Sequence, residues 1–253
     1  MSNRDDDRRP TKAERKEQAR LERLEIQRQM ASRKRTRTIG LVLVALAAVV
    51  AVIAVVVLQP DRAAVASTDE LLAQAATAAE DAGCSEVQTT GDYPGGADGG
   101  GLAHDLFREQ PPPLDTYPST PPASGPHADT TLPAGVSDSS PEIGRLIHSL
   151  EHGGSVVWYS PEAPAEQIDA IEAFYGQDDP VGQDRVIVAP YDYDEAGGQL
   201  PDGVQMALVA WHRLQTCATP SLEVAFDFTS QYSAPPTQGR EYAGEAPEAG
   251  GVM

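Results

Sequence analysis

The sequence predicts an α+β protein in which one transmembrane helix is followed by a compact extracytoplasmic domain. Residues 39–58 form an uncharged apolar run that is long enough to cross a bilayer as a single helix. Beyond it, strand-like and helix-like patterns alternate, which predicts a βαββα-type two-layer domain with the helices packed on one sheet. A proline-rich stretch interrupts these patterns and predicts an extended arm.

Charge changes sign across the apolar run. Residues 1–38 carry 13 Lys or Arg against 7 Asp or Glu, a net charge of +6, whereas residues 59–253 carry 6 against 31, a net charge of −25. The positive-inside rule therefore predicts a single-pass cell-membrane protein with a cytoplasmic N-terminus and an extracytoplasmic C-terminal domain. We expect segment 1–38 to be disordered or partly helical and to contact anionic inner-leaflet lipids, not nucleic acid, through Arg33, Lys34, Arg35 and Arg37.

A cleaved signal peptide is the main alternative to a membrane anchor. Ala64, Val65 and Ala66 form an A-x-A-like cleavage site shortly after the apolar run. Cleaved signals, however, carry only about 7 to 15 apolar residues behind a short basic stretch. Here 20 apolar residues follow a charged segment of 38, which favours an uncleaved anchor.

Residues 59–83 are predicted to form a linker and one short helix. Ser67 or Thr68 can cap the helix at its start, and Gly83 can end it. The apolar side chains recur along one side of this helix and are Leu71, Leu72, Ala75 and Ala79.

The extracytoplasmic α+β domain is predicted to span residues 84–232, and it begins with two irregular stretches. Glycine dominates residues 88–103, which are therefore expected to form a loop. Prolines recur through residues 110–127 and favour an extended backbone over a helix. Because this proline-rich arm also carries Leu114 and Tyr117, we expect it to dock on the domain.

Residues 140–153 carry the clearest helix pattern in the domain. Ser140 is the expected N-cap, and Gly153 falls where the helix should end. The predicted buried stripe consists of Ile143, Leu146, Ile147 and Leu150. His148 and His152 lie nearly opposite that stripe, so we expect both imidazoles to point away from the core.

The remaining segments alternate between the two kinds of pattern. Strand-like patterns occupy residues 155–160, 185–191 and 204–214, and helix-like patterns occupy residues 164–176 and 220–232. From Ser233 onward, Pro, Gly, Glu and Ala dominate the composition. Residues 233–253 are therefore predicted to form a disordered C-terminal tail.

The chain has two cysteines, Cys84 and Cys217, and both follow the apolar run. In an extracytoplasmic domain oxidation is allowed, so we expect one disulfide that closes a loop of more than 130 residues. Two buried free thiols are the alternative.

Five short strings in the domain are specific enough to compare with known families: PPASGPH (121–127), HSLEHG (148–153), VAPY (188–191), ALVAW (207–211) and RLQTC (213–217). Together they resemble the domain of unknown function 3105 family, over residues 82–232. The resemblance implies a single-pass bacterial membrane protein with an outer domain of no established activity. Ala123 and His212 depart from the family's usual Thr and Gly, whereas four histidines match its pattern: His104, His127, His148 and His152.

One interpretation of these histidines is a metal site. His148 and His152 lie one helical turn apart and can reach one ion together. His127 or His104 can then complete a tetrahedral or three-ligand site for zinc or copper. The alternative is structural: His127 and His148 hydrogen-bond backbone carbonyls of the proline-rich arm and hold it on the sheet.

The string HSLEH also fits the H-x-x-E-H form of zinc peptidases. Glu151 would then activate water, Glu223 would be a distant ligand, and a solvent-open cleft would lie over Glu151. A five-residue match in so small a domain is weak support for an enzyme. We therefore predict an extracytoplasmic binding domain of unidentified ligand, in which the histidine cluster offers a metal site. The alternative is a structural or protein-interaction module of the cell envelope without metal, and a zinc-dependent hydrolase is the less favoured one.

Overall fold

The structure, a computed structural model, describes residues 67–94, 112–177 and 185–251. The predicted cytoplasmic segment and apolar span, residues 1–58, lie outside this part of the chain. Within the described residues, no helix is both long enough and apolar enough to cross a bilayer. All the elements below belong to one compact unit, Val65–Met253.

The described residues build a mixed six-stranded sheet with the strand order β1-β6-β5-β3-β4-β2. Its strands are β1 Gln88–Thr89, β2 Gly135–Val136, β3 Ser155–Tyr159, β4 Val186–Pro190, β5 Met206–Ala210 and β6 Arg213–Cys217. β2 and β3 flank β4 in parallel, and β5, β6 and β1 follow by antiparallel pairing. β3, β4 and β5 are almost wholly buried, as expected for strands with continuous apolar runs.

The prediction of a single strand over residues 204–214 is wrong. β5 ends at Ala210, the chain turns at Trp211 and His212, and β6 returns from Arg213. His212 adopts the left-handed conformation, with φ of 55°. Tight hairpin turns usually have Gly or Asn at such positions. Trp211 and His212 therefore gave no signal of a turn within the strand-like pattern.

Four α-helices occur in the described residues, each within three residues of its predicted bounds: α2 Thr68–Asp81, α3 Ile143–Glu151, α4 Ala165–Tyr175 and α5 Leu222–Tyr232. A short 3-10 helix, η1 Leu114–Thr116, lies in the proline-rich arm. α2 begins at a predicted cap. The Ser67 side chain accepts from the Glu70 N–H, and the Glu70 carboxylate accepts from the Ser67 N–H, which forms a capping box.

α3 begins later than predicted. Its N-cap is Glu142, which makes no side-chain capping hydrogen bond. Ser140, the predicted cap, instead donates from Oγ to the Pro190 carbonyl at 3.0 Å and accepts from the Asp192 N–H at 3.0 Å. These bonds tie the segment before α3 to the end of β4.

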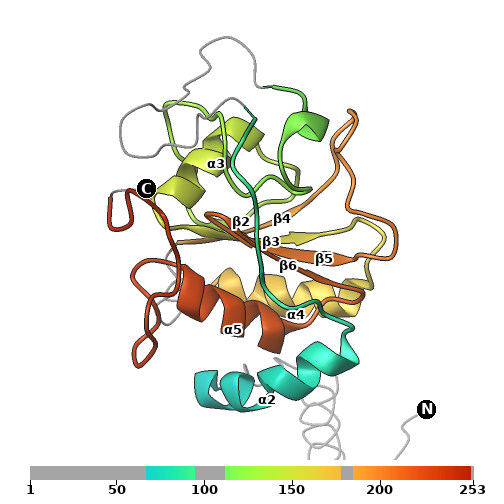
Figure 1. Ribbon diagram of the computed structural model, residues 1–253. Coiled ribbons are helices and arrows are strands. Elements are labelled where there is room, and N and C mark those ends of the chain that lie inside the picture. Colours follow the sequence, from blue (N-terminus) through green and yellow to red (C-terminus); the bar gives the residue numbers. More distant parts are fainter. Residues whose placement is uncertain (1–66, 95–111, 178–184, 252–253) are drawn as a thin grey trace, which may run out of the picture. The chain divides into compact units, whose positions relative to one another are not determined.

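Helices cover both faces of the sheet, not one face as the sequence predicts (Figure 1). α3 lies over one face and α4 and α5 lie over the other, with α2 packed against α5. Val156 and Trp158 of β3 join the core under α3, whereas Val157 between them joins the core under α4 and α5. Because successive side chains of a strand point to opposite faces, an apolar run needs cover on both sides.

The described residues of the C-terminal tail, 233–251, make backbone hydrogen bonds with the rest of the domain. The Ala234 N–H donates to the Gly153 carbonyl at 2.7 Å, and the Ala243 N–H donates to the Gln231 carbonyl at 3.0 Å. Ala246 is buried in the core under α3. Composition predicts how much apolar surface a segment can bury, but it carries no information about such backbone hydrogen bonds.

Cys84 and Cys217 form a disulfide, as predicted. The bond connects the chain just after α2 with the end of β6, across a separation of 133 residues. In the chain-entropy model, closing a loop of this length stabilises the fold by about 5 kcal/mol. The disulfide therefore fastens α2 to the sheet.

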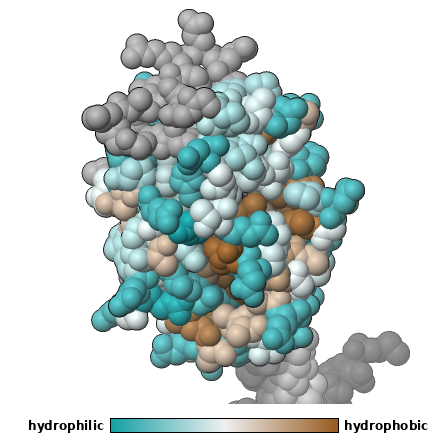
Figure 2. Space-filling view, in the orientation of Figure 1, coloured by the Kyte–Doolittle hydropathy of each residue, from teal (hydrophilic) through white to brown (hydrophobic). Residues whose placement is uncertain are grey.

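One face of the domain is mainly hydrophilic (Figure 2). Hydrophobic residues reach that surface in a few areas, which hydrophilic residues border. The largest apolar side chains, including Trp158 and Phe226, are fully buried. The apolar residues thus mainly fill the two cores on either side of the sheet.

Candidate metal centre

The C-terminal end of α3 places three candidate ligands on one side of the helix. His148, Glu151 and His152 occupy positions i, i+3 and i+4, which are neighbours on a helix surface. His148 and Glu151 are buried, and His152 is only partly exposed. The sequence predicts that both imidazoles point away from the core, but they are covered: the His148 ring contacts His127 of the proline-rich arm, and His152 contacts Glu248 of the C-terminal tail.

The proline-rich arm supplies a third imidazole, that of His127, whose exposed fraction is 1%. Tyr117 fixes the chain just before it, because its buried hydroxyl donates to the Pro126 carbonyl at 2.8 Å. Just after it, the Ala128 N–H donates to the carbonyl of Gly144 in α3 at 3.1 Å. The chain is therefore held within the arm just before His127 and tied to α3 just after it.

The two ring nitrogens of His127 have different neighbours. Nδ1 lies 2.8 Å from the Gly125 carbonyl oxygen, and Nε2 lies 3.0 Å from Oε2 of Glu151. A carbonyl oxygen only accepts hydrogen bonds, so Nδ1 carries a proton. In a neutral imidazole, Nε2 would then direct a lone pair at the carboxylate. This contact therefore requires a cation between the two groups, which is either a proton or a metal ion.

The electrostatic surroundings of His127 favour the protonated, positively charged form of its imidazole. Burial by itself lowers the pKa of an imidazole. Here the hydrogen bonds to Glu151 and Gly125, together with the charges of Glu151 and Glu248, outweigh burial and raise the pKa of His127. In the absence of a metal ion, a proton on Nε2 meets the requirement for a cation.

The C-terminal tail supplies Glu248, which the sequence did not predict as a site residue. Its Oε2 lies 3.1 Å from Nε2 of His152, and its N–H donates to the Glu151 carbonyl at 3.1 Å. Arg185 donates to the carbonyls of His152 and Gly251 and so ties the tail to the end of α3. The low-complexity composition around Glu248 contains no signal that could have found it.

The candidate ligand atoms form two groups of three, each held within 4.8 Å. The inner triad is His127, His148 and Glu151, and all three residues are buried. The outer triad is His148, His152 and Glu248, of which Glu248 is exposed. His148 is common to both groups.

The residues of the inner triad fit a transition-metal ion. Imidazole and carboxylate are the ligands of many zinc sites, and two histidines with one carboxylate leave a further coordination position open. Imidazole also suits copper. Metal-bound histidines usually donate their other ring N–H to a carbonyl or carboxylate, as His127 does to Gly125.

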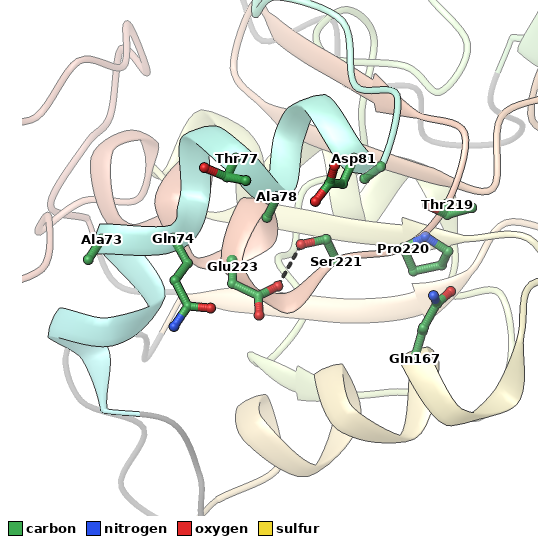
Figure 3. A pocket seen from close by; sticks show the side chains of 11 residues that line it. Ala73, Gln74, Thr77, Ala78, Asp81, Gln167, Thr219, Pro220, Ser221 and Glu223 are labelled. Carbon is green, nitrogen blue, oxygen red and sulfur yellow. Dashed lines mark hydrogen bonds between the residues drawn. The ribbon is translucent and has the colours of Figure 1, made fainter.

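Two other candidate ligands were predicted from the sequence. His104 lies outside the described residues. Glu223 lies at the start of α5, where its Oε2 accepts from Oγ of Ser221 at 2.7 Å. These two residues line a polar cavity of about 510 Å³ together with Asp81 of α2 and Gln167 of α4 (Figure 3). The cavity belongs to a different part of the domain from either triad.

Glu151 does not occupy the position of a hydrolytic base. Its exposed fraction is 1%, and its carboxylate faces His127. A hydrolase would need a solvent-open cleft over this carboxylate so that water and substrate could reach it. Glu151 is therefore better placed to hold a cation than to activate water.

Fold and site together define a class: a disulfide-linked α+β domain with a buried histidine and carboxylate cluster at the end of one helix. Residues 115–248 match the family described as "Protein of unknown function (DUF3105)", and the chain belongs to this family. The family resemblance predicted from the sequence is thereby confirmed, and the matched residues include both triads. No curated protein and no solved structure matches the chain significantly.

Proposed function

We propose that this domain binds a divalent transition-metal ion, zinc or copper, through the inner triad. The observation that carries the proposal is the pair of contacts made by His127. Its Nδ1 is directed at the Gly125 carbonyl, so its Nε2 is left to face the Glu151 carboxylate at 3.0 Å. A metal ion bound by His127, His148 and Glu151 supplies the cation that this contact requires.

Burial of the triad strengthens the need for that cation. The exposed fraction of both His127 and Glu151 is 1%. A carboxylate removed from water is costly unless a nearby charge neutralises it. A divalent ion neutralises Glu151 and allows both imidazoles to stay neutral.

A second candidate function is a structural or protein-interaction module of the cell envelope that binds no metal. The raised pKa of His127 favours this candidate, because protonated His127 and ionised Glu151 form a buried ion pair. The pair would then hold the proline-rich arm on α3. A zinc-dependent hydrolase has less support, since Glu151 is closed off from solvent.

Elemental analysis of the full-length chain, purified in detergent without chelators, distinguishes these functions. Metal binding predicts zinc or copper in the wild-type protein and a loss of one ion per chain in His127→Ala and in Glu151→Gln. Matched controls are His212→Asn, which changes a histidine outside the triads, and Glu223→Gln, which changes a carboxylate outside them. Wild-type protein that contains no metal and gains none when zinc or copper is added would contradict the proposal.

Chelation gives an independent measurement on the same protein. A ligand present at 100 times its dissociation constant stabilises the folded state by about 2.7 kcal/mol. Removing the ion should therefore lower the midpoint of thermal unfolding, and adding zinc should restore it. A midpoint that does not change in either direction would favour the metal-free module.

We also propose that residues 39–58 form a helix that spans the cell membrane and holds the domain on its outer side. The change of charge across this run and the Cys84–Cys217 disulfide support it, because disulfides persist in oxidising compartments. Protease added to intact spheroplasts should digest the domain and leave residues 1–38 protected. A domain that resists protease until the cells are lysed would contradict this topology.

A further inference from the structure

We infer that the outer triad is a second metal subsite, so that the domain holds two ions on either side of His148. This inference rests on the proposed function and adds to it a second ion, a bridging ligand and a difference in access. The ligands of the second ion are His148, His152 and Glu248. One of them comes from the C-terminal tail.

One ion cannot use all five ligand residues as they are arranged. Metal bonds to imidazole and carboxylate are about 2.0 to 2.2 Å long, so two ligand atoms of one ion are at most about 4.4 Å apart. The five residues instead form two groups, each within 4.8 Å, and only His148 belongs to both. The arrangement suits one ion in each group.

The outer triad has the spacing of a coordination shell. Nε2 of His148 and Nε2 of His152 are 3.0 Å apart, and Nε2 of His152 is 3.1 Å from Oε2 of Glu248. Two nitrogens on a tetrahedral zinc ion are about 3.3 Å apart for bonds of about 2.0 to 2.1 Å. The observed separation is within about 0.3 Å of that value.

A divalent ion placed among these three atoms would accept a lone pair from each of them at once.

His148 is placed to bridge the two ions. Its ring contacts the rings of both His127 and His152, with centroid separations of 5.0 and 4.7 Å. Nε2 faces His152, so Nδ1 is the nitrogen that would serve the inner ion. An imidazole bound through both nitrogens releases its ring proton to solvent and becomes an anion. Two divalent ions, two carboxylates and one imidazolate then leave a net charge of +1.

The two subsites differ in access to water. All three inner ligands are buried, whereas the exposed fractions of the outer side chains are 14% for His152 and 41% for Glu248. The outer ion therefore exchanges more readily and keeps coordination positions that solvent or a small anionic ligand can reach. The inner ion, in contrast, serves the packing of the proline-rich arm on α3.

Metal titration of the full-length protein tests this inference. We expect two zinc ions per chain in the wild type and one in His152→Ala and Glu248→Gln, with the inner ion retained. Glu245→Gln is the matched control, since Glu245 is another carboxylate of the tail and pairs with Arg213. One ion in the wild type that Glu248→Gln leaves in place would overturn the second subsite and leave the proposed function intact, whereas no ion at all would overturn both.

Electron paramagnetic resonance of the copper-loaded protein tests the bridge. Two copper(II) ions joined by an imidazolate couple magnetically, so the wild-type signal should be weaker than its copper content predicts. Glu248→Gln should restore the full signal of one isolated ion. A full-intensity signal from a wild-type chain that contains two copper ions would overturn the bridging role of His148.

Discussion

The proline-rich arm and the C-terminal tail cover the same end of α3, but they are held there in different ways. The described part of the arm, residues 112–127, buries Leu114, Tyr117 and His127. The described part of the tail, residues 233–251, makes several backbone hydrogen bonds with the domain and also accepts from Arg185. Each segment delivers one candidate ligand, His127 from the arm and Glu248 from the tail.

This difference explains why the sequence predicted one segment to dock and the other to be disordered. Large apolar side chains in an irregular stretch indicate that it has surface to bury, and the arm has them. Many contacts of the tail are backbone hydrogen bonds, for which any residue type except proline offers a donor. Segments that dock through backbone contacts are therefore easily mistaken for disordered ones.

The largest expected effect comes from removing the main apolar side chain of the arm. Tyr117→Ala should lower the free energy of unfolding by about 3 to 5 kcal/mol, as measured for other buried aromatic residues. Tyr117→Phe, which removes only the hydrogen bond to Pro126, should cost about 1 kcal/mol. Denaturant unfolding measures both losses of free energy. The comparison is Tyr242→Ala, which removes a partly buried aromatic side chain from the tail. An equal loss in Tyr117→Ala and Tyr242→Ala would mean that the two segments are held in the same way.

A smaller effect is expected from releasing the tail. Arg185→Gln removes charged hydrogen bonds to the carbonyls of His152 and Gly251, and at this partly exposed side chain the loss should total about 1.5 to 3 kcal/mol. Hydrogen exchange should become faster at the Glu248 amide while the amides around His127 stay protected. Arg240→Gln is the control, because Arg240 holds the tail to Asp227 of α5 instead. Unchanged exchange at Glu248 would show that other contacts suffice to hold the tail.

The smallest expected effect is a pH dependence of the free energy of unfolding of the metal-free protein. The pKa of His127 is raised above its usual value near 6.5, so protonated His127 stabilises the fold below that pH. This contribution should be lost as the pH rises through the raised pKa. Unfolding of chelator-treated protein at a series of pH values measures it, and Glu151→Gln should weaken the dependence. Stability that increases over this range would mean that His127 is held neutral.

The sequence predicted much of the fold because the signals are local. The capping box at Ser67 and the apolar spacing of α3, α4 and α5 gave helix bounds within three residues. The Cys84–Cys217 disulfide followed from there being only two cysteines. The turn at Trp211 and His212 was missed, because neither residue is typical of a hairpin turn.

What the sequence determined by itself is the helix that carries His148, Glu151 and His152, since spacing along one helix is fixed by its 3.6-residue turn. Tertiary structure decided that His127 meets Glu151 and that Glu248 meets His152. These partners are separated by tens of residues, and their approach depends on how irregular segments dock. Such docking is set by packing and backbone hydrogen bonds across the whole domain, which no local pattern encodes.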